Sequence, residues 1–324
     1  MCTAITLSGA SHYFGRNLDL EYSYGETVTI TPRQYPFKFI GGQKLEKHYA
    51  MIGIAYVVQD YPLYYDATNE KGLSIAALNF PGNAVYQKNA GYAKYIASFE
   101  VIPWLLSRCK NIDEVKKELA EFTIVDDAFS QALQPTPLHW FAADKYQAIT
   151  IETTVNGLKI YDNYVGVLTN NPPFDYHLNH LSEFMNVTSQ NAENHFALDL
   201  PIEAFSRGMG GKGLPGDLSS SSRFIRAAFV KWNSIFEHSY EESINQFFHI
   251  LASVEQQKGC ARLENGACEM TLYSSCCNTE KGIYYYRTYG NSQITAVDMR
   301  KENQDGNQLI SYPIIRRQQI LYQN

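Results

Sequence analysis

The sequence predicts an α+β fold built on antiparallel sheets. Short segments rich in β-branched and aromatic residues fill both ends of the chain, and the segments with helical periodicity are grouped between them. Strands that follow one another, rather than alternating with helices, favour antiparallel pairing. No internal repeat and no low-complexity linker divides the 324 residues, a length that one large domain accommodates. We therefore expect a single domain that spans residues 1–324.

Strands are predicted throughout the first third of the chain. The first strands are separated by small and polar turn residues at 8–11 and 24–26, and the turn NEKG at 69–72 precedes the last one. The predicted strands in this third cover residues 3–8, 13–18, 27–31, 51–58 and 73–78.

Helices are predicted in the middle of the chain. Asn111 stands three residues before Glu114, which resembles a capping box and predicts a helix over 112–122. Pro103, in the apolar stretch before it, indicates a kink or a helix start. Amphipathic patterns predict later helices over 222–236 and 241–256. The remaining predicted strands cover residues 138–143, 148–153, 158–161, 270–275, 283–289 and 293–297.

Charge and hydropathy argue against nucleic-acid and membrane partners. The net charge of −6 comes from 33 acidic and 27 basic residues, and the most basic cluster, Arg316-Arg317, is too short for a nucleic-acid interface. Nowhere do about 18 apolar residues run together, so no membrane insertion is expected. The N-terminus lacks the pattern of an export signal. We expect a cytoplasmic protein whose six cysteines, none in a zinc-type spacing, are reduced.

Cys2 is the first candidate for a catalytic residue. Because Cys is small, removal of the preceding Met1 is expected, which would leave Cys2 with a free α-amine. An α-amine titrates near pH ~7.7–8.0 and a thiol near ~8.5, so the amine can accept the thiol proton close to neutral pH. Nucleophile and general base would then lie in one residue. The position alone is a weak signal, since most cysteines behind an initiator Met are inert.

Arg16 and Asp19 are candidates for the surroundings of Cys2. If the strands over 3–8 and 13–18 form a hairpin, both side chains lie beside Cys2. Asp19 would hydrogen-bond the α-amine, and Arg16 would stabilise the thiolate. The alternative is a surface ion pair at the end of a strand.

Asparagines end two predicted strands. Asn79 closes the strand over 73–78, and Asn170 follows the apolar pair Val167-Leu168. A side-chain amide supplies N–H donors that suit a tetrahedral oxyanion. The alternative is ordinary turn chemistry, because Asn is common before Pro or Gly.

Arg223 stands at the start of a predicted helix. The serines at 220–222 are explained as helix caps. A cation in the first turn opposes the helix dipole, so Arg223 indicates a separate role.

A glycine-rich segment precedes this helix. Residues 208–213 match the G-x-G-x-x-G pattern, but no strand comes before them and Pro215-Gly216 follows where a helix should begin. Lys212 is followed by Gly213, which also excludes a Walker A loop. We expect a flexible loop beside the site.

Taken together, these motifs resemble a known family. The chain contains, in order, MCT at 1–3, FGRNLD at 14–19, LNFPG at 78–82, LTNNP at 168–172 and SRF at 222–224. Each motif is weak alone, and jointly they are highly specific. They look like the choloylglycine hydrolase family of N-terminal-nucleophile amidases, which contains bile salt hydrolases and penicillin V acylases. The resemblance covers essentially the whole chain.

The resemblance implies a fold and a mechanism. The fold is a four-layer αββα sandwich, and the reaction is amide hydrolysis through an acyl-enzyme on Cys2, with no metal or organic cofactor. Asp19 would position the amine, and Arg16 would contact the thiol and the substrate. The oxyanion hole would include Asn79 and Asn170, with Asn171 as the alternative to Asn170, and Arg223 would support the charge network.

Within this family, the resemblance favours conjugated bile salts as substrates. Asn79 is typical of the bile-salt branch, whereas penicillin V acylases tend to carry Tyr there. The triplet Gly211-Lys212-Gly213 resembles a form that the family associates with glycine conjugates. Such enzymes commonly form tetramers, so a homo-oligomer is expected. An apolar steroid pocket is needed, and its predicted wall residues are Leu20, Tyr24, Tyr65 and Phe129.

Two alternatives remain at this point. A penicillin V acylase or an N-acyl homoserine lactone acylase of the same fold would keep the same polar residues. A non-catalytic binder of steroid-like molecules would bind without turnover and would not depend on Cys2. The presence of a nucleophile with its full set of polar partners argues against this second alternative.

Overall fold

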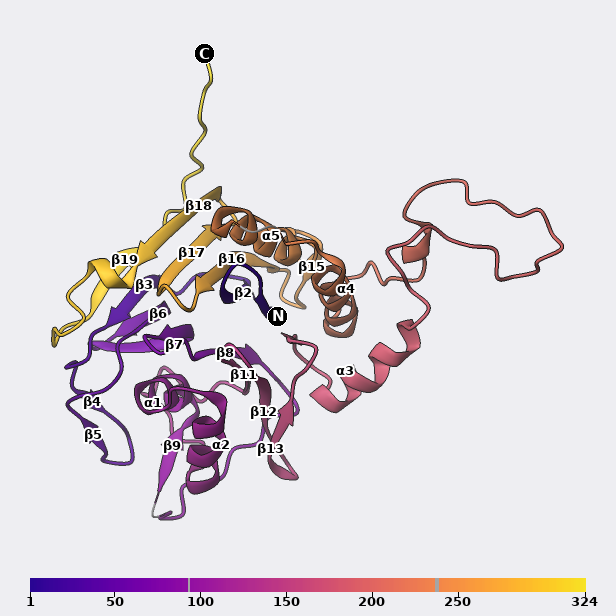
Figure 1. Cartoon of the computed structure of the whole chain (residues 1–324). Coiled ribbons are helices and arrows are strands. Elements are labelled where there is room, and N and C mark those ends of the chain that lie inside the picture. The colour runs from indigo at the N-terminus through magenta and orange to yellow at the C-terminus, as the bar shows by residue number, and fades with distance from the viewer. Residues whose placement is uncertain (93, 237–238) are drawn as a thin grey trace.

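In the computed structural model, which describes residues 1–92, 94–236 and 239–324, two antiparallel sheets lie face to face (Figure 1). Helices α4 (Ser220–Asn233) and α5 (Tyr240–Ala252) cover the outer face of one sheet. Helices α1 (Val101–Arg108) and α2 (Ile112–Glu121) cover the outer face of the other sheet. The layers therefore follow the order helix, sheet, sheet, helix, which confirms the predicted αββα sandwich.

The first sheet combines strands from the N-terminal and C-terminal parts of the chain. Its N-terminal hairpin pairs with C-terminal strands, so residues far apart in sequence meet at its centre. The strands lie in the order β14 (Val167–Leu168), β1 (Cys2–Ser8), β2 (His12–Leu20), β16 (Cys268–Asn278), β17 (Ile283–Thr288) and β18 (Asn291–Asp298), with β15 (Ala261–Arg262) pairing to β16.

The second sheet is formed mainly by the middle of the chain. Its strands lie in the order β13 (Gly157–Asp162), β12 (Ala148–Thr154), β11 (Leu138–Ala143), β8 (Ser74–Asn79), β7 (Tyr61–Asn69), β6 (Met51–Val58), β3 (Thr27–Thr31) and β19 (Ile310–Pro313). Short pairs lie outside the main sheets: β4 (Phe37–Lys38) with β5 (Lys44–Leu45), and β9 (Tyr95–Ala97) with β10 (Thr123–Val125).

Most predicted elements are present, with small differences at their ends. The predicted helix over 241–256 already ends at Ala252, and the helix over 222–236 begins at Ser220 and ends at Asn233. Strands β7 and β19 and helix α3 (Phe174–Leu181) were not predicted. Residues that are uncommon in such elements explain why they were missed. These are Pro62 and Asp66 in β7, Pro313 in the edge strand β19, and the two prolines directly before α3.

The start of α2 follows the predicted capping pattern in part. The Asn111 side chain accepts a hydrogen bond from the Glu114 nitrogen at 3.0 Å, which caps the helix. The Glu114 carboxylate, however, accepts from the nitrogen of Lys110 at 2.9 Å rather than from that of Asn111. Helix α1 contains Pro103 in its first turn, where a proline needs no partner for its nitrogen.

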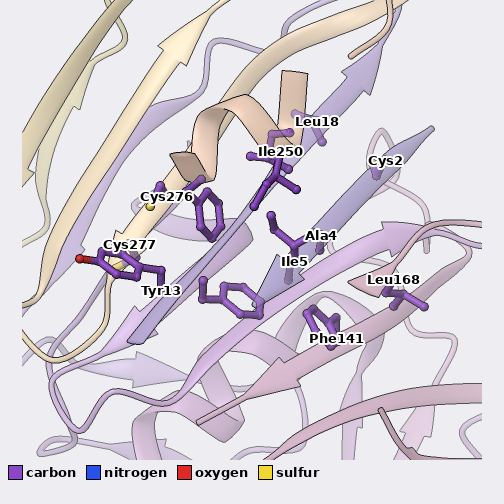
Figure 2. Packing of buried hydrophobic residues seen from close by; sticks show 14 of the residues in the cluster. Cys2, Ala4, Ile5, Tyr13, Leu18, Phe141, Leu168, Ile250, Cys276 and Cys277 are labelled. Carbon is purple, nitrogen blue, oxygen red and sulfur yellow. The ribbon is translucent and has the colours of Figure 1, made fainter. Parts of the chain in front are cut away.

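The β1–β2 hairpin sends alternate side chains to opposite faces of its sheet. Cys2 pairs with Leu18 and Ala4 with Arg16, and paired residues share a face. Phe14 stacks on Phe141 of the second sheet at 5.4 Å between ring centroids, so this face looks between the sheets. In Figure 2, Phe141 lies on one side of the hairpin and Ile250 of α5 lies on the other.

The odd-numbered residues of β2 therefore face the helices. Tyr13 contacts Phe247 of α5 with ring centroids 6.5 Å apart, and the Asn17 amide donates to the Leu251 carbonyl at 2.9 Å. Cys2 and Arg16 thus point into the space between the sheets, whereas Asp19 points toward the helix layer. This alternation divides the polar residues around Cys2 into two groups.

Candidate active site

Cys2 lies at the beginning of β1 and lines a cavity of about 330 Å³ between the sheets. The volume falls at the lower end of the range typical of ligand pockets, which is roughly 300–1,000 Å³. The residue is 2% exposed. The other lining residues are Arg16, Leu18, Leu20, Glu21, Tyr24, Tyr56, Leu63, Tyr64, Tyr65, Ala77, Asn79, Ser98, Phe99, Phe129, Leu133, Gln134, Pro135, Thr136 and Leu138.

The predicted wall residues all line this cavity. Leu20, Tyr24, Tyr65 and Phe129 come from different segments of the chain. Phe99, Leu63 and the segment from Leu133 to Leu138 complete the wall and were not predicted. The sequence gives no signal for them, because a side chain that lines a cavity does not differ in sequence from one that only packs in the core.

Asn170 holds the main-chain nitrogen of Cys2. The Cys2 nitrogen donates to Asn170 Oδ1 at 2.7 Å, and the strand before Asn170, β14, pairs with β1. The neighbouring Asn171 donates its amide to the carbonyl of Pro81 instead. Asn170, and not Asn171, is therefore the asparagine that contacts Cys2.

The amide nitrogen of Asn170 has a further partner. Its Nδ2 donates to the main-chain oxygen of Asn79 at 2.7 Å. An amide nitrogen carries two hydrogens, so one donor remains after this bond. Asn79 itself ends β8, lines the cavity, and has no hydrogen-bond partner for its side-chain amide among the described residues.

Arg223 connects Cys2 to Asn170 from the helix side. Its Nη1 donates to the Cys2 carbonyl at 2.5 Å and to Thr3 Oγ1 at 2.6 Å, and its Nη2 donates to Asn170 Oδ1 at 2.9 Å. Its Nε donates to the carbonyl of Leu218 at 3.0 Å. Arg223 is fully buried in the first turns of α4. These acceptors explain a cation at a place that the helix dipole disfavours.

Asp19 lies on the same face as Arg223. Its Oδ1 accepts from Thr271 Oγ1 at 2.6 Å, whereas its buried Oδ2 has no hydrogen-bond partner among the described residues. Arg223 Nη1 is 3.9 Å from that oxygen. Burial raises the pKa of the Asp19 carboxyl, and Arg223 together with the Thr271 hydroxyl opposes this shift.

Arg16 lies on the cavity side of the hairpin. Its Nη1 donates to the carbonyl oxygens of Tyr65, at 2.9 Å, and of Ala77. Its Nη2 is buried and has no partner among the described residues. Burial works against the charged form, but electrostatic interaction with Cys2, Tyr273 and Asp66 raises the pKa of Arg16 above its ordinary value. The guanidinium therefore stays charged and keeps a donor available.

Buried histidines hold the loop that carries Asn170. His177 Nε2 donates to the Asn170 carbonyl at 3.0 Å, and His139 Nε2 donates to the carbonyl of Thr169 at 2.9 Å. Burial lowers the pKa of His177 to about 4, so this ring is neutral at neutral pH. Ser220 Oγ accepts from the Asn170 nitrogen at 2.8 Å. The sequence reading missed both histidines, since nothing in their spacing relates them to Asn170.

The glycine-rich loop does not lie where it was expected. None of residues 208–213 lines the cavity. Gly210 packs against the backbone of Thr188 and Gln190, where a Cβ would approach the Gln190 oxygen to 2.2 Å. The loop belongs to the connection between α3 and α4, part of which projects from the body of the molecule (Figure 1).

Metal-ligating and membrane-spanning features were also sought in the described part of the chain. Among those residues no group of three or more His, Cys, Asp or Glu side chains is arranged to hold a metal ion. No described helix has the length and apolar character needed to cross a membrane.

Two antiparallel sheets between helix layers define the sandwich fold of the N-terminal-nucleophile hydrolase type. The chain belongs to the linear amide C–N hydrolases, choloylglycine hydrolase family, whose sequence profile matches residues 2–312. It is 54% identical over 314 residues to a bile salt hydrolase/transferase from Lactiplantibacillus plantarum (strain ATCC BAA-793 / NCIMB 8826 / WCFS1), with 97% of each chain covered.

Solved structures agree with this assignment. A mutant conjugated bile acid hydrolase from Clostridium perfringens matches with a TM-score of 0.92 and 36% identity, over 100% of both chains. Penicillin V acylase from Agrobacterium tumefaciens matches with a TM-score of 0.78 and 18% identity, covering 96% of this chain and 91% of that one. The second match concerns the fold alone.

Proposed function

We propose that this enzyme hydrolyses the amide bond of glycine- or taurine-conjugated bile salts through an acyl-enzyme on Cys2. The observation that carries the proposal is that Cys2 lines a largely apolar cavity while Asn170 holds its main-chain nitrogen. Relatives named as bile salt and conjugated bile acid hydrolases support the substrate class. The chemistry requires no metal and no organic cofactor.

The mechanism requires the removal of Met1, because an attached residue keeps the Cys2 nitrogen as a non-basic amide. The Met1 amine donates to the Asp19 carbonyl at 2.8 Å and pairs with Glu269. Once Met1 is removed, the Cys2 amine faces Asn170 Oδ1, and the unpartnered Asp19 Oδ2 is its second acceptor. Burial lowers the pKa of the Met1 amine, which shows that this buried end of β1 favours the basic form of an amine.

In the acylation step the amine takes the thiol proton, and the Cys2 sulfur attacks the carbonyl carbon of the substrate amide. The carbonyl oxygen becomes an oxyanion that accepts from the Asn79 amide and from the second hydrogen of Asn170 Nδ2. The amine then passes its proton to the leaving nitrogen, and glycine or taurine departs. Water attacks the thioester with the same amine as base, which releases the bile acid and restores the thiol.

The character of the cavity wall supports the proposal that it binds a steroid acyl group. Its wall is mainly apolar and aromatic, including Leu20, Tyr65 and Phe129. Arg16 supplies a charged donor near Cys2, which suits the thiolate or a polar part of the substrate. The triplet at 211–213 lies outside the cavity, so any preference for glycine conjugates rests on the family resemblance.

The proposal is tested by measuring release of glycine and taurine from glycocholate and taurocholate by the wild type and by Cys2→Ala. Intact mass is measured on the same samples to establish whether Met1 has been removed. We expect the wild type to lack Met1 and to hydrolyse both conjugates, and we expect Cys2→Ala to be inactive. The relative rates then give the conjugate preference.

Two other results would contradict the proposal. If the wild type without Met1 cleaves neither conjugate but cleaves penicillin V or an N-acyl homoserine lactone, the protein is a penicillin V acylase or an N-acyl homoserine lactone acylase. Binding of bile salts without turnover, unchanged in Cys2→Ala, would indicate a non-catalytic steroid-binding protein.

We also propose a homo-oligomer, with a tetramer as the expected state, and a cytoplasmic location. The projecting segment, residues 185–208, supports the first part, because Phe196, Leu198 and Phe205 are each at least 86% exposed. Large exposed apolar side chains that gather on one segment, unlike ones scattered singly over a surface, are typical of a surface that another chain covers. Cell fractionation tests the location.

A further inference from the structure

Asp66 is a buried carboxylate that the proposed mechanism does not use. It lies on β7, is 2% exposed, and faces the first sheet. Its Oδ1 accepts from Tyr273 Oη at 2.8 Å, and its Oδ2 accepts from Tyr284 Oη at 2.5 Å and from Ser275 Oγ at 3.4 Å. Three hydroxyl donors converge on one side chain.

The contacts of Asp66 suit a carboxylate, although burial leaves the pKa of its carboxyl above the ordinary value. Burial alone raises the pKa of the carboxyl, and the nearby Arg16 and the three hydroxyl donors oppose that rise. A protonated carboxyl would also need an acceptor for its own hydrogen, and both oxygens are already occupied as acceptors. The hydroxyl groups are therefore oriented for a negative charge.

The buried charges around Cys2 divide into two groups, one on each face of the hairpin. Arg223 and Asp19 lie on the helix face, 3.9 Å apart. On the cavity face, Cys2, Tyr273 and Asp66 stabilise the charge of Arg16, with a smaller contribution from Asp19 and no direct ion pair between Arg16 and Asp66. Because a buried guanidinium without a counter-charge is costly, the two arginines need separate partners.

The backbone links Asp66 to Arg16 in two places. The Arg16 nitrogen donates to Ser275 Oγ at 3.2 Å, and the same hydroxyl donates to Asp66. The second link is a bulge in β7: Asp66 pairs with Ile54 and Tyr64 pairs with Ala55, so Tyr65 is the extra residue. Its carbonyl accepts from Arg16 Nη1. Bulges of this kind re-aim groups beside active sites.

A bulge in β16 places the donors. Thr271 pairs with Asp19 and Tyr273 pairs with Leu18, so one extra residue lies between them. Without it, Thr271 and Tyr273 would point to the same face. With it, Thr271 bonds Asp19 on the helix face and Tyr273 bonds Asp66 on the cavity face.

We propose that Asp66 is a positioning residue for Arg16: the carboxylate, held by Tyr273, Tyr284 and Ser275, fixes the guanidinium on the cavity face beside Cys2 through Ser275 and the Tyr65 carbonyl. This inference rests on the proposed function for the role of Arg16 in turnover. It assigns the tyrosines of β16 and β17 to the active site, although neither is predicted to touch the substrate.

The test is a double-mutant cycle with Asp66→Asn and Arg16→Gln. In the Arg16 background we expect Asp66→Asn to lower kcat/KM for glycocholate about 10- to 100-fold. In the Arg16→Gln background we expect the same change to cost less than about 3-fold, because the group that it acts on is gone. Equal losses in both backgrounds would mean that Asp66 serves only the fold.

A matched control comes from Asp144, another buried aspartate with several donors. Its carboxylate accepts from the nitrogens of Ile112, Tyr146 and Gln147, in a different part of the molecule. We expect Asp144→Asn to affect stability but to leave kcat/KM within about 3-fold. If Asp66→Asn fails to fold, Tyr284→Phe removes a single donor, and its smaller loss should likewise disappear in Arg16→Gln.

Thiol reactivity separates this inference from the proposed substrate. The rate of Cys2 alkylation by iodoacetamide at fixed pH depends on the thiolate and on nearby cations, and requires no bile salt. We expect Asp66→Asn to slow alkylation in the Arg16 background and to leave it unchanged in Arg16→Gln. If the wild type hydrolyses no bile salt, an effect of Asp66→Asn on alkylation that requires Arg16 still supports the positioning role of Asp66. An effect that is the same with and without Arg16 overturns that role.

Discussion

Arg223 satisfies acceptors on several residues, and this makes it different from an ordinary buried cation. The acceptors belong to Cys2, Thr3, Asn170 and Leu218. A guanidinium presents its donors in a rigid, planar fork, whereas a lysine ammonium is a compact point charge. The shape of the side chain, as well as its charge, therefore holds the first residues of β1 against the Asn170 loop.

We predict that Arg223→Lys abolishes most activity although it keeps the charge. The shorter reach of one ammonium leaves either the Cys2 carbonyl or Asn170 Oδ1 without a donor. We expect kcat/KM for glycocholate to fall about 100-fold and the free energy of unfolding to fall by about 2–3 kcal/mol. Steady-state kinetics and urea denaturation measure the two effects.

Arg226→Lys is the control on the same helix. Arg226 donates to the carbonyl of Pro215 at 3.2 Å and does not contact Cys2. We expect this variant to retain activity within about 3-fold. Comparable losses in both variants would point to a general effect on α4.

At the scale of elements, β2 and β16 approach each other closely at Gly15. A Cβ on this residue would lie 2.0 Å from the Ser275 carbonyl oxygen, which is backbone and cannot turn aside. The flanking residues of the two strands include Arg16 and Ser275, which serve the site. Backbone contact between these strands therefore sets the position of Arg16.

We predict that Gly15→Ala destabilises the protein by about 3 kcal/mol or more, or prevents its folding. The added methyl group would force β2 and β16 apart along the centre of the first sheet. Thermal unfolding of the purified variant, or its soluble fraction on expression, measures the effect. Gly216→Ala is the matched control, because a Cβ at Gly216 meets no atom within 4 Å.

Glu100 connects the start of α1 to a neighbouring loop. Its carboxylate accepts from the nitrogens of Ala97 at 2.9 Å and Ile40 at 2.7 Å. Burial raises the pKa of Glu100 to about 7, with these two donors opposing the shift and Asp127 adding to it. Its folded pKa therefore lies above the unfolded value of about 4.5.

The sign of the resulting pH dependence follows from proton binding. Below pH 4.5 Glu100 is protonated in both states, and as the pH rises toward 7 the folded state alone retains the proton, so its stabilising contribution is lost. The variant Glu100→Gln has no titrating carboxyl at this position and therefore lacks this pH-dependent contribution to stability. We predict that its stability relative to the wild type rises by about 2 kcal/mol between pH 5 and pH 7. Urea denaturation at both pH values tests this, with exposed Glu264→Gln expected to show no such change.

At the scale of the whole molecule, the projecting segment has no core of its own. It leaves the sandwich between α3 and α4 and exposes large apolar side chains (Figure 1). We predict that the double variant Phe196→Ser, Phe205→Ser reduces the assembly size, because the apolar area covered by a second copy would be lost. Sedimentation velocity measures this change.

Activity distinguishes an assembly role from a general folding defect in that variant. Neither residue lines the Cys2 cavity, so we expect glycocholate hydrolysis to stay within about 3-fold of the wild type. Tyr146→Ser, which removes another exposed aromatic residue, should leave the assembly unchanged. An unchanged sedimentation coefficient in the double variant would show that the projecting segment is not part of the subunit interface.

Much of this organisation follows from local pattern. The strands over 27–31, 51–58 and 138–143 were predicted with the bounds that the structure has, because runs of β-branched, aromatic and other apolar residues are strong local signals. Strand β7 was missed because Asp66 and Pro62 interrupt such a run. Asp66 is tolerated there only because tyrosines from β16 and β17 donate to it, and these contacts are not visible in the sequence of β7.

The sequence by itself predicted the hairpin that brings Arg16 and Asp19 near Cys2, and only the structure showed that Arg16 shares the face of Cys2 while Asp19 lies on the other face. The grouping of strands and helices also predicted an α+β fold with antiparallel sheets, and the motifs that resemble one family implied its αββα layering. Only the tertiary structure decided which asparagine holds Cys2, because Asn170 lies 168 residues away and its orientation depends on β14, α4 and the buried histidines. The same holds for Asp66: its partners are long-range, and a buried charge takes its meaning from the donors that surround it.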